Sequence, residues 1–372
     1  MKKSLIALAV AGTFAAPAFA ATSNVDVYGT LRYSVDHASR KGDNNDGWKI
    51  NDQTSRFGLK GSEDLGGGMK AVYQIEQQIN ATNGPLDNYS HNDGVTAGTT
   101  PVDSAFGGAG LRNTFVGLAG GFGTVIIGRH DTPYKLGGSA DLFADTSADS
   151  QKNGSGIIGR NGFDNRVSGT IAYVSPDWSG FHFAAATVPG EENVGKAGAV
   201  AGATNDAHNL MDAYSIVAVY ANGPLKATLA QESFGKKLAG TTSNASATKF
   251  NIAYKIGDIG LGYTFERSSD LLNGGTGDKD SAHLASVSYT MGPIVLAGQY
   301  GKFNNKGVDT AGTTAWNGST QYSNTDMSRW TVGATYNLSK RTNAYIAYNS
   351  DNFKAAAAED IQVWTMGVNH SF

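Results

Sequence analysis

The chain has 372 residues, among them 49 glycines, 8 prolines and 16 each of tyrosine and phenylalanine, and its formal net charge is −3. This balance lacks the basic excess of a nucleic-acid binder, and the absence of cysteine excludes disulfide and thiolate chemistry. Abundant glycine and aromatic residues disfavour helices and suit strands joined by tight turns.

The first twenty residues predict a cleaved secretory signal peptide. Lys2 and Lys3 form a positive n-region, residues 5–14 are apolar, and Ala18-Phe19-Ala20 fits the small-x-small cleavage rule, so the mature chain is expected to begin at Ala21. The apolar stretch is too short to span a membrane as a helix. No later apolar run reaches eighteen residues, which argues against a helical membrane protein.

From residue 25 onward, apolar and polar residues alternate with a period of two. The pattern is clear in residues 25–36, 250–256, 259–265 and 330–338. Because successive side chains of a strand point to opposite faces, each strand presents one apolar face. A barrel with an apolar exterior and a polar interior has this alternation and an overall hydrophobic content as moderate as the 40% found here.

Short turns and long polar loops alternate strictly along the chain. Seven tight turns, most of them built on glycine or proline, lie at 64–68, 120–121, 175–180, 222–224, 257–258, 291–293 and 339–341. Eight loops rich in Asn, Asp, Gly, Ser and Thr lie at 38–53, 81–111, 131–165, 189–211, 235–246, 269–281, 304–327 and 353–359. This asymmetry is typical of outer-membrane barrels, in which the short turns face the periplasm.

The pattern therefore predicts an all-β fold. We expect residues 21–372 to form a single domain, a 16-stranded antiparallel transmembrane β-barrel with short periplasmic turns, long external loops and its last strand paired with its first. A barrel of this size is too wide for side chains to fill, so an aqueous channel is the physical expectation.

Four arginines are expected to face the lumen. Arg32, Arg56, Arg112 and Arg166 each fall on the face opposite their apolar neighbours. A lipid-facing arginine at mid-membrane costs roughly 2–4 kcal/mol. The alternative is that some lie at strand ends and extend to the headgroups.

The third loop, residues 131–165, is predicted to fold inward as a constriction loop. It carries apolar residues that need a surface to pack on, and the inner wall offers one: Leu136, Leu142, Phe143, Ile157 and Ile158. Asp141, Asp145 and Asp149 would share one face if a short helix forms there. Across a gap of ~8 Å at an effective dielectric of ~40, each would interact with a wall arginine by roughly 1 kcal/mol, enough to bias which ions enter. The alternative is an ordinary solvated surface loop.

Several stretches resemble the trimeric general porins of the Gram-negative outer membrane. Residues 55–66 and 338–342 are specific in combination, and the other matching stretches are 27–29, 74–76, 115–118, 128–129, 173–176, 332–336 and 370–372. The resemblance implies a homotrimer of barrels, each with its third loop inside. It also implies a constriction between wall and loop, formed by Arg32, Arg56, Arg112, Arg166 and Glu76 on the wall and by Asp141, Asp145 and Asp149 on the loop.

Two positions depart from that family's pattern. Arg32 lies two residues beyond the usual basic position, which is Thr30 here, and residues 137–143 replace the Pro-Glu-Phe-Gly-Gly-Asp stretch of enteric members. The resemblance also implies that Phe372 is an assembly signal read by the barrel-assembly machinery, although a lipid-facing girdle residue would serve as well. The expected partners are outer-membrane lipid, lipopolysaccharide, and small hydrophilic solutes and ions.

Other function classes are less well supported. The seven histidines are scattered without a nucleophile motif, so no enzyme is expected. Residues 43–47 lack the spacing and closing Glu of a calcium loop, and no metal or cofactor is expected. The main alternative to a general diffusion channel is a substrate-specific porin for a sugar or an anion.

Overall fold

The fold is almost entirely β-structure. The computed structural model describes residues 24–40, 47–79, 82, 110–151, 156–189, 210–235, 244–269, 279–306, 325–354 and 360–372. The predicted signal peptide and most of the 43–47 turn lie outside these ranges. Within them the one α-helix is α2 (Pro133–Leu136), and none is long and apolar enough to cross a membrane.

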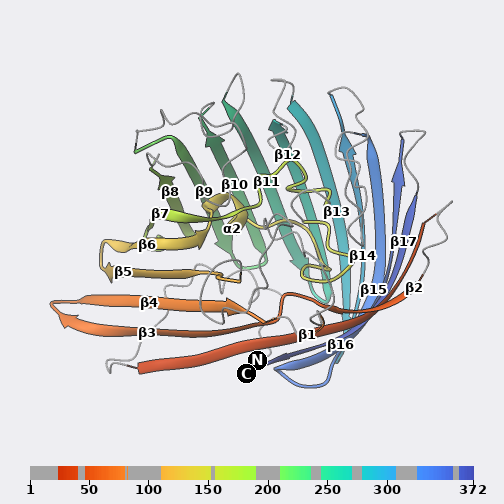
Figure 1. Ribbon diagram of the computed structural model, residues 1–372, viewed down its shortest axis with the longest axis horizontal. Helices are drawn as coiled ribbons and strands as arrows, with labels where there is room; N and C mark the ends of the chain where they lie inside the picture. Colours follow the sequence, from red (N-terminus) through yellow and green to blue (C-terminus); the bar gives the residue numbers. More distant parts are fainter. Residues whose placement is uncertain are drawn as a thin grey trace, which may run out of the picture.

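The described strands form one antiparallel sheet of seventeen strands that closes on itself where β17 pairs with β1 (Figure 1). The first eight are β1 (Asn24–Arg40), β2 (Gly47–Asp52), β3 (Arg56–Gly66), β4 (Met69–Gln78), β5 (Thr114–Gly120), β6 (Gly123–Asp131), β7 (Arg166–Val174) and β8 (Phe181–Val188). The others are β9 (Ala213–Asn222), β10 (Leu225–Phe234), β11 (Ala245–Ile256), β12 (Ile259–Ser269), β13 (Lys279–Met291), β14 (Ile294–Asn304), β15 (Met327–Asn337), β16 (Thr342–Phe353) and β17 (Ile361–Ser371).

The second crossing of the barrel is divided into two strands. β2 pairs with the second half of β1, and β3 pairs with its first half. Between them Thr54 adopts a left-handed φ of 64°, and the backbone N–H of Arg32 donates to the Ser55 hydroxyl at 2.9 Å. This local bulge interrupts the strand without moving it out of the wall. Counted as one crossing, β2 and β3 bring the seventeen strands to the sixteen that the sequence predicts, so the barrel prediction is confirmed.

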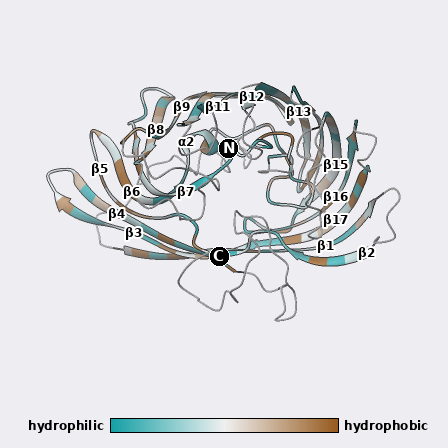
Figure 2. Ribbon diagram, turned by 45° about the horizontal axis from the view of Figure 1, so that its top comes forward, coloured by the Kyte–Doolittle hydropathy of each residue, from teal (hydrophilic) through white to brown (hydrophobic). Residues whose placement is uncertain are grey.

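The period-two pattern sorts side chains between the two faces of the wall. On β1, Val25 and Val27 are about 60% exposed on the outside, whereas Ser34 and Asp36 are buried on the inside. Figure 2 shows the resulting alternation of hydrophobic and hydrophilic residues along strands such as β1 and β3. Apolar side chains therefore cover the exterior of the wall, and polar ones cover much of its interior.

The segment between β6 and β7 lies against the inner wall. Tyr134 and Phe163 pack on Val217 and Ala230, in a cluster supplied by β8 to β11. Farther along, Ile157 and Ile158 are fully buried against a second cluster: Ala282, Leu284, Phe303 and Met327. In Figure 1 this segment lies across β11 to β14. The apolar residues that would be out of place in a solvated loop thus fill the space between the segment and the wall.

Candidate functional site

A cluster of arginines lines the wall section from β1 to β5. Arg32 lies on β1, Arg56 opens β3, and Arg112 lies two residues before β5. All three side chains are largely buried, with 13–22% of their surface exposed. Glu76 of β4 lies between two of them, with Arg112 Nε 2.6 Å from Oε1 and Arg56 Nε 3.9 Å from Oε2. The basic wall therefore carries one carboxylate within it.

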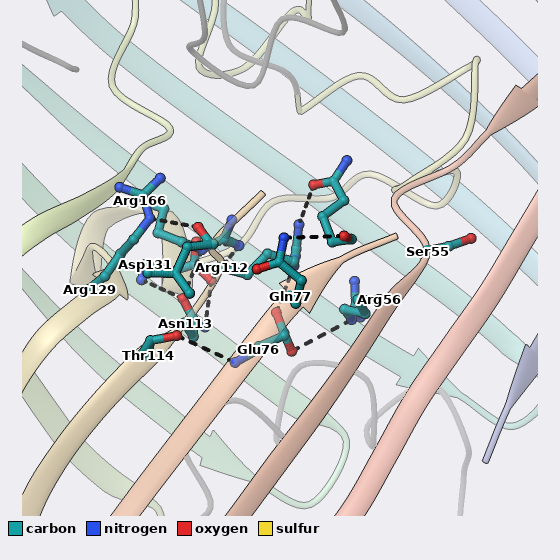
Figure 3. A network of polar contacts seen from close by, with 12 residues as sticks. Ser55, Arg56, Glu76, Gln77, Arg112, Asn113, Thr114, Arg129, Asp131 and Arg166 are labelled. Atoms are coloured by element: carbon teal, nitrogen blue, oxygen red, sulfur yellow. Dashed lines mark hydrogen bonds and ion pairs between the residues drawn. The ribbon is translucent and has the colours of Figure 1, made fainter. Parts of the chain in front are cut away.

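Glu76 is held in place from three directions. Tyr28 donates its hydroxyl hydrogen to Oε2 at 3.0 Å, and the backbone N–H of Arg112 donates to the Glu76 carbonyl at 2.8 Å. Figure 3 shows Glu76 between Arg56 and Arg112, with Thr114 at its backbone. Because a charge-assisted hydrogen bond orients both partners, Glu76 fixes the direction in which Arg112 points.

Asp145 is the loop carboxylate that reaches this wall. Its Oδ2 contacts Arg32 Nη1 directly and lies 3.9 Å from Arg56 Nη1. Burial raises the pKa of Asp145, but Arg32, Arg56 and Arg112 outweigh burial and lower this pKa to about 2. The carboxylate is therefore ionised at neutral pH. The expectation of a gap of about 8 Å between wall and loop charges is wrong at Arg32, where the loop touches the wall.

Asp141 and Asp149 have a different role from that of Asp145. The three aspartates do not share a helical face, because residues 141–149 form turns and the one helix nearby is α2. Asp141 accepts from the backbone N–H groups of Phe143 at 3.0 Å and Ser150 at 2.9 Å, and Asp149 accepts from that of Asp145 at 2.9 Å. Because short Asp side chains accept hydrogen bonds from nearby backbone N–H groups, they stabilise turns in competition with a helix. The predicted short helix is therefore replaced by turns.

The pKa of Asp149 is raised well above its usual value. Burial is the largest cause, followed by the neighbouring carboxylates of Asp141 and Asp145. A raised pKa favours the neutral form of the Asp149 carboxyl, which lowers its repulsion with the carboxylates beside it. These two residues shape the loop that presents Asp145.

Arg166 belongs to a second, charge-balanced group. Its Nη2 lies 3.0 Å from Asp131 Oδ1, and its Nε donates to the side-chain oxygen of Asn113 at 2.8 Å (Figure 3). Lys135 of α2 lies 3.7 Å from both Asp131 and Asp164. The structure thus places Arg166 apart from the Glu76 and Asp145 contacts that Arg32, Arg56 and Arg112 make.

The tip of the loop is also attached to β1. Asp36 is fully buried and accepts hydrogen bonds from the Ser147 hydroxyl and from Asn51. Gln53 donates to Ser147 at 2.6 Å and to Ser34 at 2.7 Å. These residues are not among the predicted site residues. The available signal was parity, since Asp36 falls on the lumen face of β1 together with Ser34.

Two further anchors hold the loop at its root and on the opposite wall. Glu266 of β12 accepts from the Tyr134 hydroxyl at 2.7 Å and from the Gly159 N–H at 3.0 Å. Arg329 of β15 donates to both carboxylate oxygens of Asp351 and to the backbone carbonyl of Asp149 at 2.5 Å. The loop is thus bound to the wall at three places, namely β1, β12 and β15.

Among the five residues whose ion pairs join Asp145 to the wall, the charges do not cancel. Arg32, Arg56 and Arg112 supply three positive charges, and Glu76 and Asp145 supply two negative ones, which leaves one net positive charge. In a narrow passage such an excess attracts anions more than cations.

Phe372, the predicted assembly residue, lies on the outer face next to β1 and is 44% exposed.

Comparisons with known proteins agree with this architecture. The family model described as Gram-negative porin matches residues 7–356. Outer membrane porin protein 32 of Delftia acidovorans is 27% identical over 354 residues, 93% of this chain and 88% of the relative.

Solved structures share the fold, and two of them serve as examples. An anion-selective porin from Comamonas acidovorans has a TM-score of 0.71 and 22% identity, over 94% of this chain and 100% of that one. OmpT of Vibrio cholerae in its trimer form has a TM-score of 0.61 and 15% identity, over 94% and 100% of the two chains.

Proposed function

The chain belongs to the Gram-negative porin family of outer-membrane channels, and we propose that it is a passive diffusion channel for small hydrophilic solutes and ions whose passage is controlled by charge at a single constriction. As a porin it is a channel rather than an enzyme. The observation that carries the proposal is the contact of Asp145, at the tip of an inward loop, with Arg32 on the opposite wall.

The constriction consists of a basic wall and an acidic loop. Arg32, Arg56 and Arg112 form the wall with Glu76 among them, and Asp145 is the loop carboxylate at the aperture. Asp141 and Asp149 support the loop from within, and Arg166 lines the adjoining wall with Asp131. This division of roles is supported by the pairing of each charge: Asp145 meets arginines, whereas Asp141 and Asp149 meet backbone N–H groups.

The same charges favour anions. One net positive charge remains among Arg32, Arg56, Arg112, Glu76 and Asp145 once the two carboxylates are set against arginines. The similarity in fold to an anion-selective porin is compatible with this sign. The anion branch of the alternative, a substrate-specific porin, is favoured by the same excess charge. A current that one anion blocks saturably would distinguish that alternative from a general diffusion channel.

Export and assembly follow the family's pattern. Residues 1–20 are a cleaved signal peptide, the barrel assembles as a homotrimer in outer-membrane lipid and lipopolysaccharide, and Phe372 is read by the barrel-assembly machinery. The trimer form of a protein with the same fold supports the oligomeric state, and the exposed aromatic terminus supports recognition of Phe372.

Planar-bilayer recording tests the function. Purified protein is expected to give stepwise, ohmic conductance with no energy source, and the reversal potential in asymmetric salt is expected to lie on the anion side. A protein that inserts and stays electrically silent contradicts the proposal. A reversal potential on the cation side contradicts the proposed charge at the constriction while leaving the channel intact.

A further inference from the structure

Arg56 is the least tightly paired of the three arginines at the constriction. Arg32 contacts Asp145 directly, and Arg112 Nε lies 2.6 Å from Glu76 Oε1. The Arg56 guanidinium lies 3.9 Å from each of these two carboxylates, which is longer than a hydrogen bond, and it donates no hydrogen bond to any described residue. Its side chain is 22% exposed. The N–H groups of Arg56 are therefore available to an anion in the passage.

A second unpaired cation lies four residues farther along the same strand. Lys60 of β3 is half-buried, and no ion pair or hydrogen bond joins its side chain to the part of the chain that the structure describes. Positions four residues apart on a strand share a face and lie about 13 Å apart, so Lys60 faces the lumen together with Arg56. β3 ends at the short turn before β4, and short turns face the periplasm in outer-membrane barrels. Lys60 is therefore the next positive charge along β3 on the periplasmic side of the constriction.

Tyr28 of β1 connects the two positions. Its ring lies against Gly58, the lumen-facing residue between Arg56 and Lys60, and a Cβ at Gly58 would come within 2.4 Å of Tyr28 Cζ. The Lys60 ammonium group lies 5.2 Å from the centre of this ring, within cation–π distance. Because the ring lies over Gly58, this contact directs the ammonium group back toward Arg56. An aromatic ring has no net charge, so it holds Lys60 without neutralising it.

The neighbours of Lys60 in the sheet do not pair with it. Asp26 lies directly opposite on β1, but the two side chains make no ion pair, and the ammonium group lies on Tyr28 instead. On its other side Lys60 lies opposite Gln74 of β4, which is neutral. Residues 1–23, which precede β1 at this end of the barrel, contain no acidic residue.

We propose that Lys60 is a second anion-binding position of the channel, which receives small anions from Arg56 on their way to the periplasm. An anion that leaves Arg56 meets the Lys60 ammonium group at the next lumen-facing charge of the same strand. Conduction requires positions that bind an ion well enough for entry and weakly enough for release. Two carboxylates share Arg56, and Lys60 acts as a single cation, so both positions suit rapid exchange. The proposal rests on the proposed preference for anions and adds a defined path along β3.

Planar-bilayer recording of variants in potassium chloride tests this path. Lys60→Gln removes the charge, and Lys60→Arg keeps it. The matched control is Lys226→Gln, because Lys226 is a half-buried lysine beside the short turn between β9 and β10 and makes no ion pair or hydrogen bond within the described ranges. It shares the lumen face of β10 with Thr228, whose hydroxyl donates to the Gly137 carbonyl of the loop. Salt gradients give the permeability ratio, and symmetric salt gives the chloride concentration at half-saturating conductance.

Lys60→Gln is expected to lower the chloride-to-potassium permeability ratio roughly twofold, as for one unit charge about 10 Å away in water. It is also expected to raise the half-saturating chloride concentration, whereas Lys60→Arg is expected to behave like the wild type. Because one anion visits Arg56 and Lys60 in turn, the effects of Arg56→Gln and Lys60→Gln are expected to be non-additive. The effects of Arg56→Gln and Lys226→Gln are expected to add.

Three results overturn the proposal. Equal effects of Lys60→Gln and Lys226→Gln make the charge a diffuse property of the lumen, and additive effects of Arg56→Gln and Lys60→Gln separate the two positions. A Lys60→Arg channel that resembles Lys60→Gln assigns the effect to packing on Tyr28. Folding of each variant is checked by the band of unheated protein on gels, and Lys60→Met replaces Lys60→Gln if the latter does not fold. A wild type that prefers cations contradicts the proposed function itself, and this result is obtained without any variant.

Discussion

Gly29 and Phe372 join the first strand of the barrel to the end of the chain. Each donates its backbone N–H to the carbonyl of the other, at 3.2 and 3.1 Å. A Cβ at Gly29 would overlap the ring of Phe372 and come 2.8 Å from the carbonyl oxygen of Arg56. The glycine therefore lets the terminal ring lie against the wall where the barrel closes.

Substitution at this closure is expected to destabilise the folded barrel. Gly29→Ala should cost about 1–3 kcal/mol, because a methyl group is forced against the wall and the terminal ring. The measurement is the temperature at which the folded band is lost on unheated versus heated gels. Gly47→Ala is the control, since a Cβ there meets nothing within 4 Å. Equal thermal stability of the two variants would show that the close approach at Gly29 does not matter.

Removal of the loop carboxylate is expected to increase anion preference. Asp145→Asn frees Arg32 and Arg56 from their common partner, so the positive excess at the constriction rises. The effect of one unit charge across a partly wet passage is at most about 1 kcal/mol, or roughly fivefold in the permeability ratio. Reversal potentials in asymmetric salt measure it. Asp149→Asn is the matched control, because that carboxylate accepts from the loop backbone; a shift as large as that of Asp145→Asn would contradict the assigned roles.

Neutral substitutions on the wall are expected to shift selectivity in the opposite direction. Arg56→Gln and Arg112→Gln each remove a positive charge and leave Glu76 less compensated, so the reversal potential should move toward cations. Arg112→Gln should have the larger effect on folding, since its Nε is 2.6 Å from Glu76. Arg341→Gln, in an exposed turn, is the control. An unchanged reversal potential in both wall variants would remove these arginines from the constriction.

A rise in pH above the ordinary carboxyl range is expected to loosen the loop. Because the pKa of Asp149 is raised in the folded protein, the native state holds this proton more tightly than the unfolded chain does. The stability that the neutral form provides is lost as pH rises from the ordinary carboxyl range through the raised pKa. Single-channel current noise should therefore increase with pH in the wild type and stay flat in Asp149→Asn. A noise increase of the same size in that variant would assign the pH dependence to another group.

The anchors of the loop are expected to control its mobility. Ile157 is completely buried against wall residues that include Leu284 and Phe303. Ile157→Ala should weaken the packing of the loop on the wall by about 2–5 kcal/mol. The open channel should then fluctuate among more conductance levels, with its reversal potential unchanged because the charges remain. The wall strands stay paired through their own ladders, so the folded band on gels should persist. A quiet channel of normal conductance would show that this packing does not restrain the loop.

The barrel itself follows from local rules. The alternation of apolar and polar residues places Val27 on the outer face and Ser34 on the inner face of the wall. The turn residues mark where the chain reverses, so the sixteen crossings could be counted from the sequence. The bulge at Thr54 could not, because its left-handed φ is accommodated by the hydrogen bond between Arg32 of β1 and Ser55 on the neighbouring crossing.

The different roles of the three loop aspartates could not be predicted from the sequence. Asp141, Asp145 and Asp149 have the same chemistry and even spacing, which suggested a helix and a common face. Instead, Asp141 and Asp149 accept hydrogen bonds from backbone N–H groups of the turns. Asp145 points toward β1 because it contacts Arg32, which is more than one hundred residues away along the chain. Long-range partners such as Asp36 for Ser147 leave no periodic trace in the loop's own sequence.

A thiol-labelling measurement on open channels tests the constriction most directly. The chain has no cysteine, so Asp145→Cys introduces a single reactive site, and Ser339→Cys introduces one in a periplasmic turn as control. A bulky methanethiosulfonate reagent is expected to reduce the current through Asp145→Cys channels sharply and to leave Ser339→Cys channels unchanged. An undiminished current through Asp145→Cys channels, with complete labelling shown by mass, would contradict a passage that narrows between Asp145 and the arginines of the wall.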